Sequence, residues 1–252
     1  MFDGQKSTDY GLHNVTIDTG LRSVPMVGGK DILEDKVRDR RNPYYQGVQH
    51  QPMQFTLYFS LLDERMTREK KNEILRWLFK DDYREFRTTD DISKCLYVIA
   101  TNQIDFETAD SELGYFRVDF RASTSHWISS PYIRTYDLSD NETSTIIEYE
   151  NLSNVGTYYS PEIEFELVSD SKSITLINLD DGGREFTFTD LWEKEKIYVD
   201  NDMQTIISDN LAFPSRLNNF NKKWLRLRYG INRIEVIGKC KLEIRSVFPV
   251  YA

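Results

Sequence analysis

The sequence predicts a mainly β protein with two domains. The 252 residues include 15 Tyr and 14 Phe, two residue types that favour strands. Several stretches alternate apolar and polar residues with a period of two, which is typical of half-buried strands, whereas one stretch has helical spacing. With 39% hydrophobic and 29% charged residues, the chain has the composition of a globular protein and enough length to bury a core.

Residues 51–62, QPMQFTLYFSLL, are the clearest strand of the first half. The positions expected on the buried face are Met53, Phe55, Leu57, Phe59 and Leu61. After this strand, Thr67 can cap a helix over residues 68–80, the one long helix that we expect. The apolar stripe of that helix comprises Ile74, Leu75, Trp77, Leu78 and Phe79.

Two further strands are expected over residues 94–108 and 114–123, joined by a turn in ADSELG. The second of them directs Phe116, Val118 and Phe120 inward. Ser, Asp, Asn and Pro residues then break the periodicity, which places a domain boundary within residues 128–142. We therefore expect one domain over residues 1–132 and a second over residues 133–252.

The second domain consists of short strand-like runs separated by turn residues. Turn signals recur about every 8 to 12 residues, which is typical of an antiparallel sandwich or barrel. The expected strands cover residues 145–150, 160–169, 173–179, 186–191, 196–200, 203–207, 224–229, 233–238 and 239–247.

The net charge of −9 argues against a nucleic-acid binder, although the charge is unevenly distributed. Residues 131–209 contain 5 Lys/Arg and 18 Asp/Glu, a net of −13, while residues 210–252 contain 9 and 2, a net of +7. We expect segments of opposite sign to lie side by side and neutralise each other. In particular, the strand over 160–169, with three glutamates on one face, is expected to be a neighbour or near neighbour of the strand over 224–229 within one sheet.

No catalytic or metal-binding motif is recognisable. His13, His50 and His126 lie far apart, and Cys95 and Cys240 each fall in a strand-like run, so we expect two reduced, buried thiols and no metal site. No glycine-rich phosphate loop precedes a helix, so no cofactor is expected. Among 41 carboxylates no glycosidase pair can be identified, which leaves a glycoside hydrolase as an alternative to a non-enzymatic role. Because no signal peptide or membrane-spanning run is present, we expect synthesis in the cytosol and no membrane insertion.

Residues 38–50, RDRRNPYYQGVQH, fit neither a strand nor a helix pattern. Arginine and tyrosine anchor many protein interfaces, so this segment is either a docking arm or a solvated loop. We expect an extended hairpin or loop that reaches an adjacent protomer, with the candidate interface residues Arg38, Arg40, Arg41, Tyr44 and Tyr45.

Aromatic rings exposed on the second domain could stack on sugar rings, although most aromatic residues of a β-sandwich lie in its core. The candidate sugar-stacking residues are Tyr158, Tyr159, Trp192 and Trp224. A carbohydrate-binding module is therefore an alternative to a purely structural role.

The order of several motifs resembles a known family. The motifs are FDGQKSTDYGL at the start, MQFTLYFSL followed by a helix ending in ILRWLF, and YFRVDF running into ISSPYI. In the second half, NVGTYYSPEIEFEL, KIYVD and WLRLRYGINRIEVIG continue the match. Together they resemble the distal tail proteins of long-tailed, non-contractile siphophages that infect Gram-positive bacteria, within the broad phage tail family.

The resemblance implies a structural component of the virion rather than an enzyme. It implies a hexameric ring at the tail tip, formed by an N-terminal sandwich- or barrel-like domain with an arm that reaches its neighbour. The C-terminal domain is implied to be a galectin-like or carbohydrate-binding-module-like antiparallel sandwich. The implied partners are further copies of the chain, the major tail tube protein, the tape-measure protein and a tail-associated tip protein of the host-adsorption baseplate.

Overall fold

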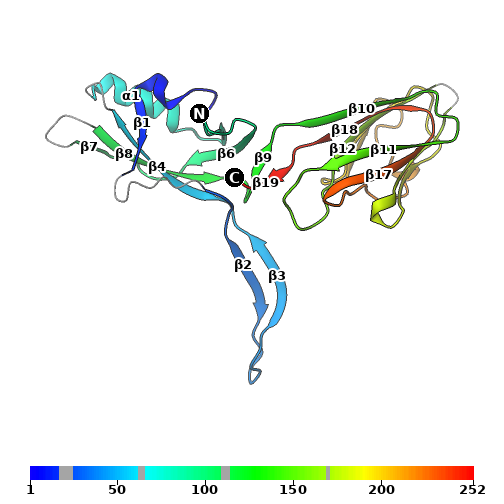
Figure 1. Cartoon of the computed structure of the whole chain (residues 1–252), viewed down its shortest axis with the longest axis horizontal. Helices are drawn as coiled ribbons and strands as arrows, with labels where there is room; N and C mark the ends of the chain where they lie inside the picture. Colours follow the sequence, from blue (N-terminus) through cyan, green and yellow to red (C-terminus); the bar gives the residue numbers. More distant parts are fainter. Residues whose placement is uncertain (17–24, 62–65, 109–113, 169–170) are drawn as a thin grey trace. The chain divides into compact units, whose positions relative to one another are not determined.

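The computed structural model describes residues 1–16, 25–61, 66–108, 114–168 and 171–252. The chain forms two compact units, one from residues 1–128 and 251–252 and the other from residues 129–250. Both units are built mainly of β-strands (Figure 1), which confirms the predicted fold class.

The sheet of the first unit is centred on the antiparallel pair β4 (Gln54–Leu61) and β8 (Gly114–Ala122). Phe59 lies opposite Phe116 with ring centroids 5.4 Å apart, so the predicted inward faces of the two strands meet in the core. Within this unit the strands follow the order β1 (Leu12–Val15), β4, β8, β6 (Lys94–Ala100) and β9 (Trp127–Ser129), with β5 (Arg84–Phe86) on β6 and β7 (Phe106–Thr108) on β8. The short strand β19 (Pro249–Val250) belongs to the second unit. The turn expected in ADSELG lies outside the described residues, apart from Gly114.

The predicted helix is α1 (Arg68–Leu78), and among the described residues it is the one α-helix. Thr67 caps it, because its hydroxyl accepts a hydrogen bond of 3.2 Å from the backbone N–H of Lys70. Trp77 is buried and donates its indole N–H to the carbonyl oxygen of Phe2, which attaches the helix to the N-terminal segment. The expected burial of Phe79 is wrong: this residue follows the last helical position, and its side chain is 58% exposed. A short 3-10 turn, η1 (Ser7–Tyr10), precedes β1.

The second unit is a sandwich of two sheets, and the strand pairs among its described residues are antiparallel. Alternate residues of both sheets point into a shared core, and Phe165, Phe186 and Val236 there are fully buried. One sheet has the order β10 (Tyr132–Leu138), β18 (Cys240–Ser246), β12 (Glu162–Leu167), β15 (Lys196–Asp200) and β16 (Thr205–Ser208). The other has the order β11 (Ser144–Asn151), β17 (Gly230–Ile237), β13 (Ile174–Asn178) and β14 (Arg184–Phe188), and two 3-10 turns, η2 (Leu179–Asp181) and η3 (Leu217–Asn219), lie between strands.

The acidic and basic segments of the second unit neutralise each other, as the sequence predicts. Among the described residues, four ion pairs join residues 131–209 to residues 210–252: Glu162–Arg245 at 4.0 Å, Asp180–Arg233 at 2.8 Å, Asp181–Arg226 at 2.7 Å and Glu195–Arg216 at 2.6 Å. The Glu195–Arg216 pair is almost fully buried, and the others are partly exposed.

The expected strand over residues 224–229 is wrong, and so is its pairing with the three-glutamate strand. β12 lies between β18 and β15, where Glu164 pairs with Lys196 at 2.7 Å. Residues 224–229 make one isolated bridge, between Leu227 and Tyr159, and lead into β17 of the opposite sheet. Leu225 and Leu227 do alternate inward, but buried asparagine side chains rather than a strand ladder bond the backbone of this segment.

Cys95 and Cys240 are free and buried, as predicted. Burial raises the pKa of the Cys240 thiol to about 12, so this group stays protonated at neutral pH. Within the described residues, no three His, Cys, Asp or Glu side chains cluster in a way that could hold a metal ion, and no helix has the length and apolar character needed to cross a membrane.

Candidate functional site

The segment with the candidate interface residues forms a protruding hairpin. Its strands β2 (Lys30–Asp35) and β3 (Tyr44–His50) pair with each other in a two-stranded sheet separate from the main sheet of the first unit (Figure 1). All residues of both strands are exposed except Gly47, which is half-buried. Because an isolated two-stranded ribbon is at best marginally stable in water, the contacts within this hairpin stabilise it only weakly.

The strand register places three exposed apolar side chains on one face of the hairpin, while the exposed Leu33 and Tyr44 lie on the other face. Ile32 lies opposite Val48, and Tyr45 lies opposite Glu34, two residues further along β2, so Ile32, Val48 and Tyr45 share a face. Their exposed fractions are 65%, 44% and 68%. Gln46 is the extra residue of a β-bulge at this point, and the bulge sets which face Tyr45 occupies.

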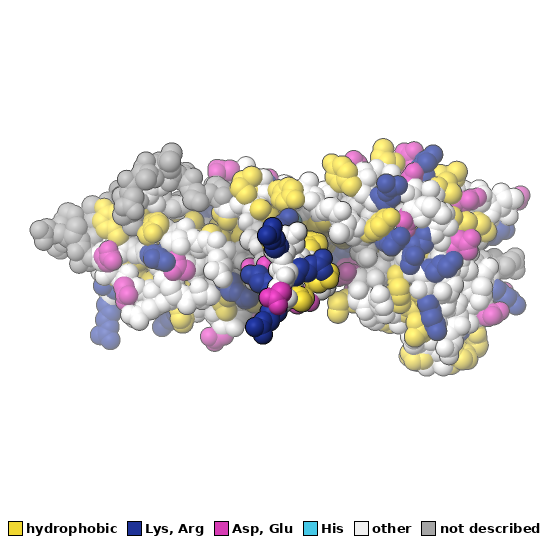
Figure 2. All heavy atoms as spheres, turned by 90° about the horizontal axis from the view of Figure 1, so that it is seen from below, with side chains coloured by type: hydrophobic (Ala, Val, Ile, Leu, Met, Phe, Trp, Pro, Cys, Tyr) yellow, Lys and Arg dark blue, Asp and Glu magenta, His cyan; other side chains and the backbone are white. Residues whose placement is uncertain are grey.

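The turn of the hairpin carries the arginines. Arg38, Arg40 and Arg41 lie between the two strands and are exposed, and the guanidinium of Arg40 lies 3.8 Å from the ring centroid of Tyr44. Figure 2, viewed along the hairpin from its tip, shows Lys and Arg side chains gathered there beside hydrophobic ones. The structure therefore brings the five candidate interface residues together at one end of the hairpin.

Neither β2 nor the apolar side chains of the two hairpin strands were predicted from the sequence. Ile32 lies in KDILED and Val48 lies near the end of YYQGVQH. Because both faces of these strands are exposed, apolar and polar residues do not have to alternate along them. The opposed β-branched pair Ile32 and Val48 is a weak signal that could have indicated a hairpin.

The segment that leads into the hairpin is hydrogen-bonded to the bend between β8 and β9 of the same unit. Gly28 donates its N–H to the carbonyl of Ser125 at 2.7 Å, and a Cβ at this position would lie 2.1 Å from the carbonyl oxygen of Gln51. Nearby, the buried His126 lies 5.6 Å from His50 between ring centroids. Burial, together with His50 and Lys30, lowers the pKa of His126, so no buried charge forms at the hairpin base at neutral pH.

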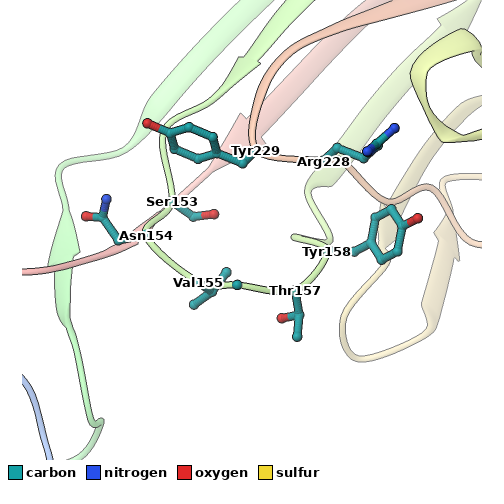
Figure 3. A pocket seen from close by; sticks show the side chains of 8 residues that line it. Ser153, Asn154, Val155, Thr157, Tyr158, Arg228 and Tyr229 are labelled. Carbon is teal, nitrogen blue, oxygen red and sulfur yellow. The ribbon is translucent and has the colours of Figure 1, made fainter.

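A second candidate site is an open pocket of about 540 Å³ in the sandwich unit (Figure 3). One wall is the loop of residues 153–158 between β11 and β12, and the other is formed by Arg228 and Tyr229 just before β17. The Tyr159–Leu227 bridge joins the two walls, with backbone hydrogen bonds of 2.9 and 2.7 Å.

The four candidate sugar-stacking residues do not form one site. Tyr158 is 45% exposed and lines the pocket, whereas the neighbouring Tyr159 turns inward and packs against the core. Trp224 packs edge-on against Phe220 of the core. Trp192 is 58% exposed and does not line this pocket. Tyr229, which was not predicted as a candidate from the sequence, is 72% exposed and lines the pocket.

Comparison with solved structures identifies the same fold in a phage protein. The crystal structure of SPP1 Dit (gp 19.1), described as a paradigm of hub adsorption apparatus in Gram-positive infecting phages, matches with a TM-score of 0.70 and 13% identity over 98% of both chains. Chains of the phage P2 baseplate in its activated conformation, with Ca or with Sr, match with TM-scores of 0.45 and 0.44 at 9% identity, over 96% of this chain and 92% of theirs. A comparison with curated protein sequences gave no match.

Family models cover nearly the whole chain. A phage tail protein N-terminal domain matches residues 1–124, and a phage tail C-terminal domain matches residues 130–246. These two matches confirm the family that the motif order indicated, and the chain belongs to the phage tail protein family.

Proposed function

We propose that this protein is a non-enzymatic hub of the phage tail tip, which closes into a hexameric ring through its first unit. In this proposal the ring joins the tail tube and the tape-measure protein to the host-adsorption apparatus and carries the sandwich units. The fold shared with SPP1 Dit, a hub protein by its description, supports this role. The virion tail would be its site of action after synthesis in the bacterial cytoplasm.

The observation that carries the proposal is the hairpin of β2 and β3. It projects three apolar side chains, Ile32, Tyr45 and Val48, on a ribbon with almost no burial within its own chain. A soluble monomer gains nothing from such a ribbon, because exposed apolar faces and open strand edges favour association. A contact between the hairpin of one copy and a different surface of the next is heterologous, and such contacts generate a closed ring when the rotation closes.

The arginines and the exposed apolar side chains of the hairpin are suited to contact another protein subunit. Among the described residues, no carboxylate lies within ion-pair distance of Arg38, Arg40 or Arg41, so these cations can pair with carboxylates of another subunit. Full burial of each large apolar side chain would contribute about 1.5 to 3 kcal/mol per interface.

The test compares two sets of substitutions in the full chain. Replacing Ile32, Tyr45 and Val48 together by Ser is expected to convert the ring into folded monomers, as seen by sedimentation velocity with an unchanged circular dichroism spectrum. The matched control replaces Ile146 and Ile207 by Ser, since these residues of the sandwich are 58% and 55% exposed and lie outside the hairpin. Equal assembly of the hairpin variant and the control would refute the assignment of the hairpin as the ring contact.

A further inference from the structure

The pocket of the sandwich unit presents aromatic rings at two sides of its opening. Figure 3 shows the Tyr229 ring on the side of Ser153 and Asn154, while Tyr158 lies beside Arg228 at the other side. Tyr229 is 72% exposed, an unusual position for a large aromatic side chain with no partner ring among the described residues. The guanidinium of Arg226 lies 3.9 Å from the Tyr158 ring centroid and covers one of the two ring faces.

Both walls of the pocket are fixed by buried asparagines. The Asn151 side chain accepts from the backbone N–H of Ser153 at 2.9 Å and donates to the carbonyl of Leu227 at 3.3 Å. Asn232 accepts from the N–H of Arg228 at 2.9 Å and donates to its carbonyl at 2.8 Å. The Tyr229 backbone therefore lies between anchored positions, so a ligand would meet a preformed surface.

Polar groups that a hydroxylated ligand could use lie between the rings. The backbone groups of residues 155–157 take no part in the backbone–backbone hydrogen bonds of the described residues. The Thr157 side chain is exposed, and the exposed guanidinium of Arg228 uses one nitrogen to donate to the carbonyl of Asp180 at 3.0 Å, which leaves further N–H groups for a ligand.

The residue types that line the pocket restrict what it can do. None of the eight lining residues is an acid, a histidine or a cysteine, so the lining holds neither the carboxylate pair of a glycosidase nor a metal ligand set. Val155 is the one aliphatic side chain among them, so the pocket offers little to bury the large apolar anchors of a protein partner. Exposed tyrosine faces with neighbouring amide, hydroxyl and guanidinium groups suit a flat ring that is apolar on its faces and hydroxylated at its edge.

We propose that this pocket binds a pyranose ring of a neutral polysaccharide, with Tyr229 as the stacking platform and Arg228 and the loop of residues 155–157 as hydrogen-bonding groups. The site lies wholly in the sandwich unit. It binds without hydrolysis, and it operates whether or not the first unit forms a ring.

The experiment is ligand-observed saturation-transfer NMR on the full chain, with cellotetraose, maltotetraose and tetra-N-acetylchitotetraose as probes. At least one probe is expected to receive saturation at its ring C–H protons. Tyr229→Ala is expected to weaken that binding about tenfold, and Tyr229→Phe to retain it because the ring face remains. Trp192→Ala is the matched control, an exposed aromatic residue outside the pocket, and is expected to bind like the unaltered protein.

Three outcomes would overturn the proposal. They are no transfer to any of the three probes, unaltered binding by a folded Tyr229→Ala variant, or loss of binding in the Trp192→Ala control. Sedimentation of the same samples separates this test from that of the hub. If Tyr229→Ala disrupts assembly, the pocket is a protein contact, and the sugar site is rejected while the ring stands.

Discussion

Replacing Asn232 by Ala tests whether side-chain amides hold the segment before β17. Asn232 is fully buried and makes four hydrogen bonds, two with the backbone of Arg228, one with the carbonyl of Gly230 and one with the side chain of Asn178. The substitution leaves three backbone groups without these partners. Because Arg228 is exposed, water can replace part of each bond, so about 1 kcal/mol per group is expected, or about 3 kcal/mol in the free energy of unfolding.

The matched control is Asn221→Ala. Asn221 also bonds two backbone groups, the carbonyl of Glu185 at 2.9 Å and the N–H of Lys223 at 3.0 Å, but it is exposed, so water replaces both bonds and less than about 0.5 kcal/mol is expected. Urea unfolding followed by circular dichroism and tryptophan fluorescence measures both variants. Equal losses for the two variants would refute the reasoning that buried amides replace a strand ladder here.

Three further substitutions follow from the buried and paired groups. Arg216→Met should cost about 4 kcal/mol in urea unfolding because it leaves the buried Glu195 carboxylate without its cation. Burial raises the pKa of Glu195, but the bonds from Arg216 and its other donors outweigh this, so the net shift is downward. The ion pair's contribution to stability should therefore be complete above pH 4.5 and should be lost as the pH falls through the lowered pKa of Glu195 in the folded protein. A cost of the substitution that does not change with pH would contradict this prediction. Glu243→Lys should raise the melting temperature through a gain of about 0.5 kcal/mol, because Glu243 lies opposite Glu164. A loss would contradict this and would mean that repulsion between the new lysine and Lys196, which pairs with Glu164, outweighs the relief of carboxylate repulsion. Ser60→Ala should raise the free energy of unfolding by about 1 kcal/mol, measured by thermal unfolding, since the buried Ser60 hydroxyl has no hydrogen-bond partner among the described residues. A decrease of similar size would show that the hydroxyl has a partner.

Strands with one buried face were predictable from the sequence. In β4, β8 and β12 the apolar positions recur every second residue because one side of the sheet packs on the core and the other meets solvent. The cap at Thr67 was equally local, since the hydroxyl and its partner at Lys70 are three residues apart.

Other features depend on contacts that no local pattern encodes. Residues 224–229 alternate like a strand, yet amides from distant positions such as Asn178 and Asn201 complete their backbone bonding. β10 (Tyr132–Leu138) was missed because its flanking Ser, Pro and Asp residues read as a loop.

Both candidate sites combine local and distant contributions. The arginines and tyrosines of the hairpin are adjacent in the chain, so composition alone selected them. Ile32 joins them only through its register with Val48. Tyr229 and Tyr158 line the same pocket because the Tyr159–Leu227 bridge joins its two walls, and periodicity does not report a contact across that sequence separation.

Native mass spectrometry of the purified chain over a range of concentrations tests the central claim, that this phage tail protein assembles into a ring. We expect a closed hexamer of about 178 kDa, six times the 29.7 kDa of one chain, with no open-ended series of larger species. A monomer at every concentration, or a ladder of oligomers without a preferred closed state, would contradict it.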